Sequence, residues 1–332
     1  MSESSKVLLD IRHLSVAVRN AQSNVPLVRD VSLQVESGET LAIVGESGSG
    51  KTLTFLAALG IAPNNIKVTA GEVLFENDDL TKLKPNELRA RRGTAISMVF
   101  QDPLSALNPV FPIGTQIIEV LRAHLPLTHA QARARAIELL ERVHIPDPHR
   151  RVDDYPHQFS GGMRQRALIA MAIALEPKVL IADEPTTALD VTVQAQVLEL
   201  LSQLREETGM ALVLITHDLG LVARHADRVA VFYAGRVVEQ AAVKDLFHKP
   251  RHPYTVSLFR TIPRLDSPVH TALTPIAGQP PNLAQLPEGC PFAPRCYLVK
   301  PECGSTQVKL INTTNKEHLS ACQYWPEVHP ES

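Results

Sequence analysis

Short apolar runs alternate with amphipathic stretches along most of the chain. Alternating and β-branched residues predict strands over 6–18 and 27–35, and continuous apolar runs predict buried strands over 41–44, 179–182, 211–216 and 228–233. The residues between them predict helices over 52–59, 192–207 and 219–225, and a mainly helical stretch over about 85–160. Strands that alternate with helices in this way favour an α/β fold built on a mainly parallel sheet.

The composition changes near residue 250. Eleven prolines lie from Pro250 to Pro301, and proline breaks both helices and central strands. We therefore predict an α/β domain over 1–250, with a helical subdomain at about 85–160, and a loop-rich C-terminal extension over 251–332. Such an extension needs something other than a large core to hold it.

Bulk composition narrows the classes of function. The 332 residues carry 33 Lys and Arg against 35 Asp and Glu, and this net charge of -2 gives no general attraction to nucleic acid. No run reaches the ~20 apolar residues of a membrane-spanning helix, and the N-terminus lacks the pattern of a signal peptide. The sequence predicts a cytosolic protein that reaches a membrane only through partners.

A glycine-rich segment follows the predicted strand over 41–44. Residues 45–52 fit the phosphate-binding pattern G-x-x-x-x-G-K-[ST] at every fixed position. Backbone N–H groups at such a turn face phosphate oxygens, the lysine reaches the β- and γ-phosphates, and the threonine hydroxyl ligates Mg2+. The residues predicted to hold ATP here are Gly45, Ser47, Gly48, Gly50, Lys51 and Thr52.

Two further motifs fit the same chemistry. A predicted apolar strand ends in Asp183 and Glu184, which predicts a Mg2+ ligand followed by a carboxylate that orients or deprotonates the attacking water. Ser160 and the glycine pair that ends at Gly162 open a second helix N-terminus suited to an anion. One chain needs one cradle for its own phosphates, so the second cradle is expected to serve the nucleotide of another subunit.

In this order, the motifs resemble the ATPase subunits of ABC transporters. Ser160 and Gly162 resemble the family's signature motif, which closes over ATP held by the opposite subunit of a head-to-tail dimer. Gln101 resembles the Q-loop glutamine that senses Mg2+ and the coupling interface. Asp190 ends a segment that resembles the D-loop, and His217 resembles the switch histidine that contacts the γ-phosphate.

The resemblance implies a fold and a set of roles. The expected fold is an ABC-type P-loop ATPase with a core mixed sheet, a helical subdomain and a loop-rich C-terminal cysteine extension. The expected catalytic residues are Glu184, Gln101 and His217. The expected Mg2+ ligands are Thr52, Gln101 and Asp183.

Two features depart from the family pattern. Phe159 and Met163 stand where the signature begins with Leu and ends with Gln. The family stacks adenine on an aromatic residue ahead of the phosphate loop, yet residues 1–54 contain none, and Val18 stands about where it would be. Because the phosphate-facing serine and glycine of the signature remain, we expect function to survive, with adenine held by other contacts.

All four cysteines lie within residues 290–322. Their spacing matches neither the C-x2-C zinc pattern nor a standard ferredoxin run, so zinc, an iron–sulfur cluster and unrelated buried thiols stay open on spacing alone. The segments 251–255, 281–283 and 289–290 resemble the C-terminal extension of peptide-importer ATPases. That resemblance implies a 4Fe-4S cluster, with zinc as the alternative, on Cys290, Cys296, Cys303 and Cys322.

The resemblance also implies a function and partners. The chain is expected to power uptake of dipeptides or oligopeptides from the cytoplasmic face of the bacterial inner membrane. Implied partners are a second, homologous ATPase chain, two membrane permease subunits and a periplasmic or extracellular solute-binding protein, with no nucleic acid. Alternatives are a related solute such as a nickel chelate or glutathione, a non-transport ABC ATPase, and a metal-sensing regulatory subunit.

Overall fold

The computed structural model describes residues 6–19, 24–187, 189–261, 275–313 and 317–329. The chain divides into two compact units, and each is described by itself. Unit 1 comprises Met1–Leu9, Val35–Glu39 and Phe75–Ile215, and unit 2 comprises Asp10–Gln34, Thr40–Leu74 and Thr216–Ser332. Unit 2 therefore contains both the phosphate-loop motif and the proline-rich extension. The domain boundary at residue 250 stays a prediction.

Unit 1 combines three parallel strands with most of the long helices. Its elements are β5 (Asp78–Asp79), η1 (Leu80–Lys82), α2 (Pro85–Arg91), β6 (Ile96–Val99), α3 (Pro103–Ala106), α4 (Ile113–His124), α5 (His129–Arg142), α6 (Pro148–Arg151), η2 (Pro156–Gln158), α7 (Gly161–Ile173), β7 (Val179–Asp183), α8 (Val191–Thr208) and β8 (Ala211–Ile215).

The three strands of unit 1 pair in parallel in the order β6-β7-β8. Ile181 of β7 lies opposite Met98 on one side and opposite Val213 on the other. Every residue of β7 and β8 is buried, which explains why these strands are continuous apolar runs without alternation. The prediction of helix throughout 85–160 is wrong at β6, because this four-residue strand forms through its pairing with β7.

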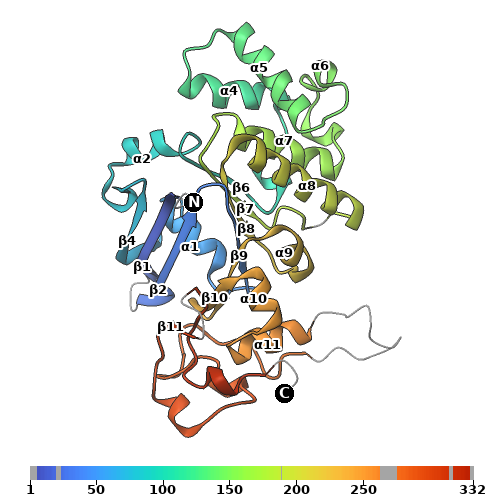
Figure 1. Cartoon of the computed structure of the whole chain (residues 1–332). Helices are drawn as coiled ribbons and strands as arrows, with labels where there is room; N and C mark the ends of the chain where they lie inside the picture. The colour runs from blue at the N-terminus through green and yellow to red at the C-terminus, as the bar shows by residue number, and fades with distance from the viewer. Residues whose placement is uncertain (1–5, 20–23, 188, 262–274, 314–316, 330–332) are drawn as a thin grey trace. The chain divides into compact units, whose positions relative to one another are not determined.

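The helices α4, α5 and α7 of unit 1 pack against one another, and α4 and α5 lie side by side in the green part of Figure 1. Leu121, Ala136 and Leu140 are buried at these contacts. A capping box begins α5. The Thr128 hydroxyl accepts from the N–H of Gln131 at 3.3 Å, and the Gln131 amide oxygen accepts from the N–H of Thr128 at 2.9 Å.

Unit 2 combines the remaining strands with shorter helices. Its elements, including three strands (β1, β2 and β4) whose end residues are assigned to unit 1, are β1 (Val7–Arg19), β2 (Asn24–Glu36), β3 (Thr40–Val44), α1 (Lys51–Ala58), β4 (Ile66–Phe75), α9 (Leu219–His225), β9 (Arg228–Tyr233), β10 (Arg236–Ala242), α10 (Val243–His248), α11 (Pro253–Arg260), η3 (Ala293–Arg295), η4 (Pro301–Gly304), β11 (Ile311–Asn312), β12 (Leu319–Ser320) and η5 (Trp325–Glu327).

The strands of unit 2 mix parallel and antiparallel pairing. β3 pairs in parallel with β9, with Ile43 opposite Ala230. β9 and β10 form an antiparallel hairpin whose two-residue turn, Ala234 and Gly235, has positive φ angles of 51° and 78°. β10 then pairs antiparallel with β12, and β12 with β11. The expected mixed sheet is thus confirmed.

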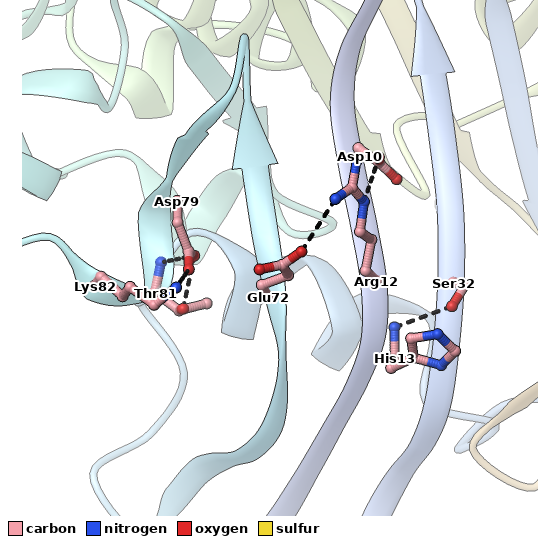
Figure 2. A network of polar contacts seen from close by, with 8 residues as sticks. All are labelled: Asp10, Arg12, His13, Ser32, Glu72, Asp79, Thr81 and Lys82. Carbon is pink, nitrogen blue, oxygen red and sulfur yellow. Dashed lines mark hydrogen bonds and ion pairs between the residues drawn. The ribbon is translucent and has the colours of Figure 1, made fainter.

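Polar contacts join three neighbouring strands of unit 2, in the order β2-β1-β4. Figure 2 shows Arg12 of β1 between Asp10 and Glu72, at 2.7 and 3.2 Å, and the N–H of His13 donating to the Ser32 hydroxyl at 3.0 Å. The Arg12 side chain is half exposed, and exposed ion pairs contribute about 0–1 kcal/mol. The backbone ladder and the buried apolar face therefore hold these strands.

The C-terminal extension packs onto the β9–β10 hairpin. The rings of Tyr233, Tyr254 and Phe292 meet with centroids 4.5 to 5.4 Å apart. Glu239 is fully buried in β10, and its carboxylate accepts from two backbone N–H groups at residues 251–252 and pairs with His318 Nε2 at 2.7 Å. Among the described residues, the extension contains one α-helix, α11, and beyond it only short 3-10 helices, two-residue strands and loops.

No helix within the described part of the chain is both long and apolar enough to span a membrane.

We expect the buried His252 to lower stability in mild acid. Burial lowers the pKa of its imidazole from an ordinary 6.5 to about 3, so between these values the unfolded chain binds a proton that the folded chain does not. This stability is complete above about pH 6.5 and falls toward pH 3, by about 1.4 kcal/mol per pH unit. In His252→Asn, whose amide can still accept from the Tyr254 N–H, the unfolding temperature should fall less between about pH 6.5 and about pH 5.

The exposed His149 offers the control. His149→Asn should keep the wild-type dependence of unfolding temperature on pH. Equal acid sensitivity of His252→Asn and the wild type would contradict the assignment.

Candidate functional site

The phosphate-loop segment lies between β3 and α1 in unit 2. Gly45 has a φ of 146°, and a Cβ built there would lie 2.2 Å from the carbonyl oxygen of Phe232, so no other residue fits. Lys51 Nζ donates to the carbonyls of Gly45 and Glu46 at 2.8 and 3.0 Å. The buried Ser49 hydroxyl has no protein partner. This backbone cradle has the form that a phosphate group requires.

The other predicted phosphate ligands follow along the loop. Ser47 and Gly48 are exposed at its crest. Gly50, with φ of 97°, is the N-cap of α1, and Thr52 lies in the first turn of that helix. The N-terminal turn of a helix is suited to an anion, which is the setting that the sequence predicts for these residues.

Three residues from distant parts of unit 2 form hydrogen bonds with the phosphate loop, and the sequence did not predict them. The N–H of Gly235 in the β9–β10 turn donates to the carbonyl of Ser49 at 2.9 Å. The N–H of Glu46 donates to the Tyr254 hydroxyl at 2.9 Å, and Arg295 forms two bonds to the Glu46 carboxylate. No local signal could reveal these contacts, because 208 and 249 residues separate Glu46 from Tyr254 and Arg295.

His217 also belongs to unit 2, where it follows directly after β8 along the chain. Its side chain is exposed. The N–H of Thr216 donates to the carbonyl of Ile43 at 3.1 Å, and the Asp218 side chain caps α9. These two contacts fix the backbone on both sides of the histidine.

In unit 1, the structure brings together two of the predicted catalytic residues. Asp183 is the buried last residue of β7. The next residue, Glu184, has a left-handed φ of 45°, a strained conformation for a residue with a side chain. Its carboxylate accepts from Gln101 Nε2 at 2.8 Å and from the Thr187 hydroxyl at 2.9 Å. Two donors on one oxygen hold the carboxylate in a single orientation.

The signature and D-loop residues stand at helix N-termini of unit 1. Ser160 is the exposed N-cap of α7, and its hydroxyl accepts from the N–H of Met163 at 3.3 Å. Gly162 lies in the first turn of the same helix. Asp190 is the N-cap of α8, where it accepts from the N–H of Val193 at 3.0 Å. Helix capping explains the residue type at Asp190 without any ligand.

The residues that depart from the family pattern differ in how deeply they are buried. Phe159 is 2% exposed, so its aromatic ring fills core space ahead of the signature motif. Met163 is half-buried, and Val18 is a half-buried residue of β1. Ala188 of the predicted D-loop lies outside the described residues. The contact that replaces the adenine-stacking aromatic stays a prediction.

The four cysteines are free thiols and half-buried. The N–H of Cys290 donates to the carbonyl of Cys303 at 2.8 Å, which joins two of them directly. Burial raises the pKa of Cys296 to about 11 and of Cys322 to about 12, and neighbouring thiols add to both shifts. In the described segments, no three or more His, Cys, Asp or Glu side chains are arranged to hold a metal ion.

Comparison with known proteins fits this geometry. Residues 28–187 match the family described as ABC transporter. The chain is 51% identical over 290 residues to the dipeptide transport ATP-binding protein DppD of Bacillus subtilis, covering 87% of this chain and 86% of that protein. This chain belongs to the ABC transporter family. Residues 238–303 of this ABC ATPase also match the C-terminal region of oligopeptide/dipeptide transporters.

Two further relatives extend the comparison. The ABC ATPase is 50% identical over 316 residues to the oligopeptide transport ATP-binding protein OppD of Mycobacterium tuberculosis, and it spans only 51% of that relative's length. The ATP-binding cassette MJ0796, solved as a dimer in a post-hydrolysis state with ADP and Pi, superposes with a TM-score of 0.64. It is 28% identical, and the match covers 71% of this chain and 99% of that one.

These comparisons confirm the predicted family and the ABC ATPase fold. They also confirm the enzyme class, an ATPase. The cysteine extension as a metal-binding element is not confirmed by them.

We expect Glu184→Gln to abolish turnover while leaving ATP binding intact. The amide keeps the contact with Thr187 but cannot take a proton from water, and loss of a general base costs about 100-fold or more in rate. Phosphate release from ATP by the purified protein, in its active assembly, is the measurement. The exposed Glu199→Gln on α8 is the matched control and should keep wild-type turnover; unchanged turnover in Glu184→Gln would remove this residue from the chemistry.

Proposed function

We propose that this chain is the ATP-hydrolysing subunit that drives uptake of dipeptides or oligopeptides across a bacterial inner membrane. One observation carries the proposal: a single chain joins an ABC cassette over 28–187 to a peptide-transporter C-terminal region over 238–303. The relatives of 51% and 50% identity are named for dipeptide and oligopeptide transport, which supports the same class of solute.

The phosphate loop would hold the nucleotide as substrate. The side-chain-free backbone at Gly45 and the partnerless buried hydroxyl of Ser49 fit a phosphate group. The loop residues proposed to contact it are Gly45, Ser47, Gly48, Gly50 and Lys51. Mg2+ would neutralise charge on the β- and γ-phosphates, and oxygen ligands of the kind it prefers are supplied by Thr52, Asp183 and Gln101.

Glu184 would act on the attacking water. Gln101 and Thr187 hold the Glu184 carboxylate in one rotamer, so it presents a fixed acceptor for a proton of the water. The attacking water would then bind in one position. His217 would contact the γ-phosphate, and its exposed side chain is accessible to a nucleotide.

A second ATPase subunit would complete the site. Ser160 is exposed at the N-terminus of α7, where free backbone N–H groups favour an anion. We propose that Ser160 and Gly162 face the nucleotide of the opposite subunit, with Asp190 at the shared interface. The dimeric form of the related cassette MJ0796 supports this arrangement.

Membrane permease subunits would dock beside the Q-loop. Large apolar side chains are exposed along residues 100–111 of unit 1, the segment that contains Gln101: Leu104 is 63% exposed, Val110 is 68% exposed, and Phe100 and Phe111 are also exposed. Such a patch is typical of a protein interface. The chain would thus lie at the cytoplasmic face of the inner membrane, while a solute-binding protein on the other side captures the peptide.

The four cysteines would hold a 4Fe-4S cluster, with zinc as the alternative. Two observations support this proposal: the four thiols are half-buried and free, and a backbone hydrogen bond joins Cys290 to Cys303. Four cysteine thiolates are a ligand set that iron–sulfur clusters and zinc both accept. We propose Cys290, Cys296, Cys303 and Cys322 as the ligands.

Uptake of a radiolabelled dipeptide by cells lacking this chain tests the function. Wild-type protein should restore uptake, and Glu184→Gln should not. Leu104→Asp should retain ATP binding but lose most uptake, because a charge at the docking patch opposes burial. Restored ATPase activity with no uptake of any di- or oligopeptide, in the presence of the membrane subunits, would contradict a peptide solute.

Metal analysis of protein purified without oxygen tests the cysteine site. We expect a brown protein with about four irons and acid-labile sulfide per chain, lost in Cys296→Ser and kept in the nearby control Ser305→Ala. A colourless protein with one zinc would make the site a structural clip. A protein with no metal would remove the site from the proposal.

A further inference from the structure

Glu46, the second residue of the phosphate loop, is held by two residues of the C-terminal part of unit 2. Arg295 donates from both terminal nitrogens to the two carboxylate oxygens, at 2.7 and 2.9 Å. The Tyr254 hydroxyl accepts from the Glu46 N–H at 2.9 Å. Both residues lie in the matched C-terminal region, 238–303, outside the nucleotide-binding motifs of residues 45–217.

Arg295 is itself locked in place. Its side chain is 5% exposed, against 23% for Glu46. Nε donates to the carbonyl of Ala277 at 2.8 Å, and a terminal nitrogen lies 3.3 Å from the Tyr233 hydroxyl. Bidentate arginine–carboxylate pairs are among the strongest polar contacts in proteins, and burial on one side limits their screening. The pair therefore has one geometry.

The charge of Glu46 makes this contact relevant to nucleotide binding. A carboxylate inside a loop that receives a triphosphate repels the ligand unless a cation cancels it. Lys51 Nζ contacts the backbone carbonyl of Glu46, not its carboxylate, and is needed for the phosphates. Arg295 is the cation that the structure places on the Glu46 side chain.

Arg295 is also tied to the cysteine segment. It ends η3, immediately before Cys296. The N–H of Arg295 donates to the carbonyl of Phe292 at 2.9 Å, and that of Cys296 to the carbonyl of Ala293 at 3.3 Å. The position of the guanidinium thus depends on the fold of residues 290–296.

We propose that Arg295 and Tyr254 are positioning residues of the nucleotide site, which neutralise Glu46 and hold the phosphate loop in its binding form. ATP affinity then depends on the folded C-terminal segment. The inference rests on the assignment of residues 45–52 as the ATP-binding loop and is independent of the transported solute.

Equilibrium titration of the full-length chain with a fluorescent ATP analogue tests the charge argument. Arg295→Met should weaken binding about tenfold, the order expected for one uncompensated charge near the phosphates. Glu46→Gln is the reference for the double variant, whose affinity should return to within about twofold of that of Glu46→Gln alone. Rescue by removal of the second charge distinguishes this role from a purely structural one. Equal weakening in Arg295→Met and the double variant would overturn the proposal.

Two more variants complete the design. Tyr254→Phe keeps the ring but removes the acceptor, and should weaken binding about threefold. Lys300→Met breaks an exposed ion pair with Glu327 in the same segment and should leave affinity unchanged. Wild-type affinity in Tyr254→Phe, or a loss in Lys300→Met as large as in Arg295→Met, would overturn the specific role.

Lys51→Ala tests separately whether residues 45–52 are the ATP-binding loop, on which the proposed role of Arg295 depends. If Lys51→Ala binds ATP as the wild type does, the loop is not the site. If Lys51→Ala loses binding while Arg295→Met keeps it, the loop stands and the inference falls. In the assembled transporter, Arg295→Met should raise the KM for ATP and leave kcat near the wild-type value. A fall in kcat with an unchanged KM would contradict a positioning role.

Discussion

The close approach of the phosphate loop to the β9–β10 hairpin constrains the rest of unit 2. At Gly45 the loop backbone lies against the carbonyl of Phe232, and at Gly235 the hairpin turn donates to Ser49 and leaves no room for a Cβ beside Leu27. Two backbones can meet this closely only where side chains are absent. These close approaches fix the path of the loop backbone against the hairpin.

The same hairpin carries the C-terminal extension. Tyr233, the last residue of β9, packs against Tyr254 and Phe292, and the buried Glu239 of β10 pairs with His318. A buried carboxylate is tolerable only when its oxygens are bonded, so its several partners must fold together. The extension is therefore part of the core that supports the phosphate loop, and Tyr254 reaches that loop directly.

The Glu184 carboxylate of unit 1, proposed to be catalytic, is constrained in a different way. Glu184 follows a fully buried strand and adopts a left-handed backbone conformation that costs of order 1–3 kcal/mol. Its N–H donates to the carbonyl of Ile215 at 2.8 Å, while Gln101 and Thr187 hold its side chain. These hydrogen bonds hold the strained Glu184 backbone and its side chain. The carboxylate is therefore oriented before a substrate binds.

The sequence by itself determined the family, the order of the motifs and most elements, because glycine spacing and apolar runs are local consequences of backbone geometry. The sequence also located the four cysteines and the proline-rich segment that begins near residue 250. Only the tertiary structure decided that β6 is a strand, since its pairing partner β7 lies some eighty residues away. The hydrogen bonds that hold Glu46 likewise come from distant residues: Arg295 lies 249 residues away in the chain, and Tyr254 lies 208 residues away. No local sequence pattern encodes such contacts.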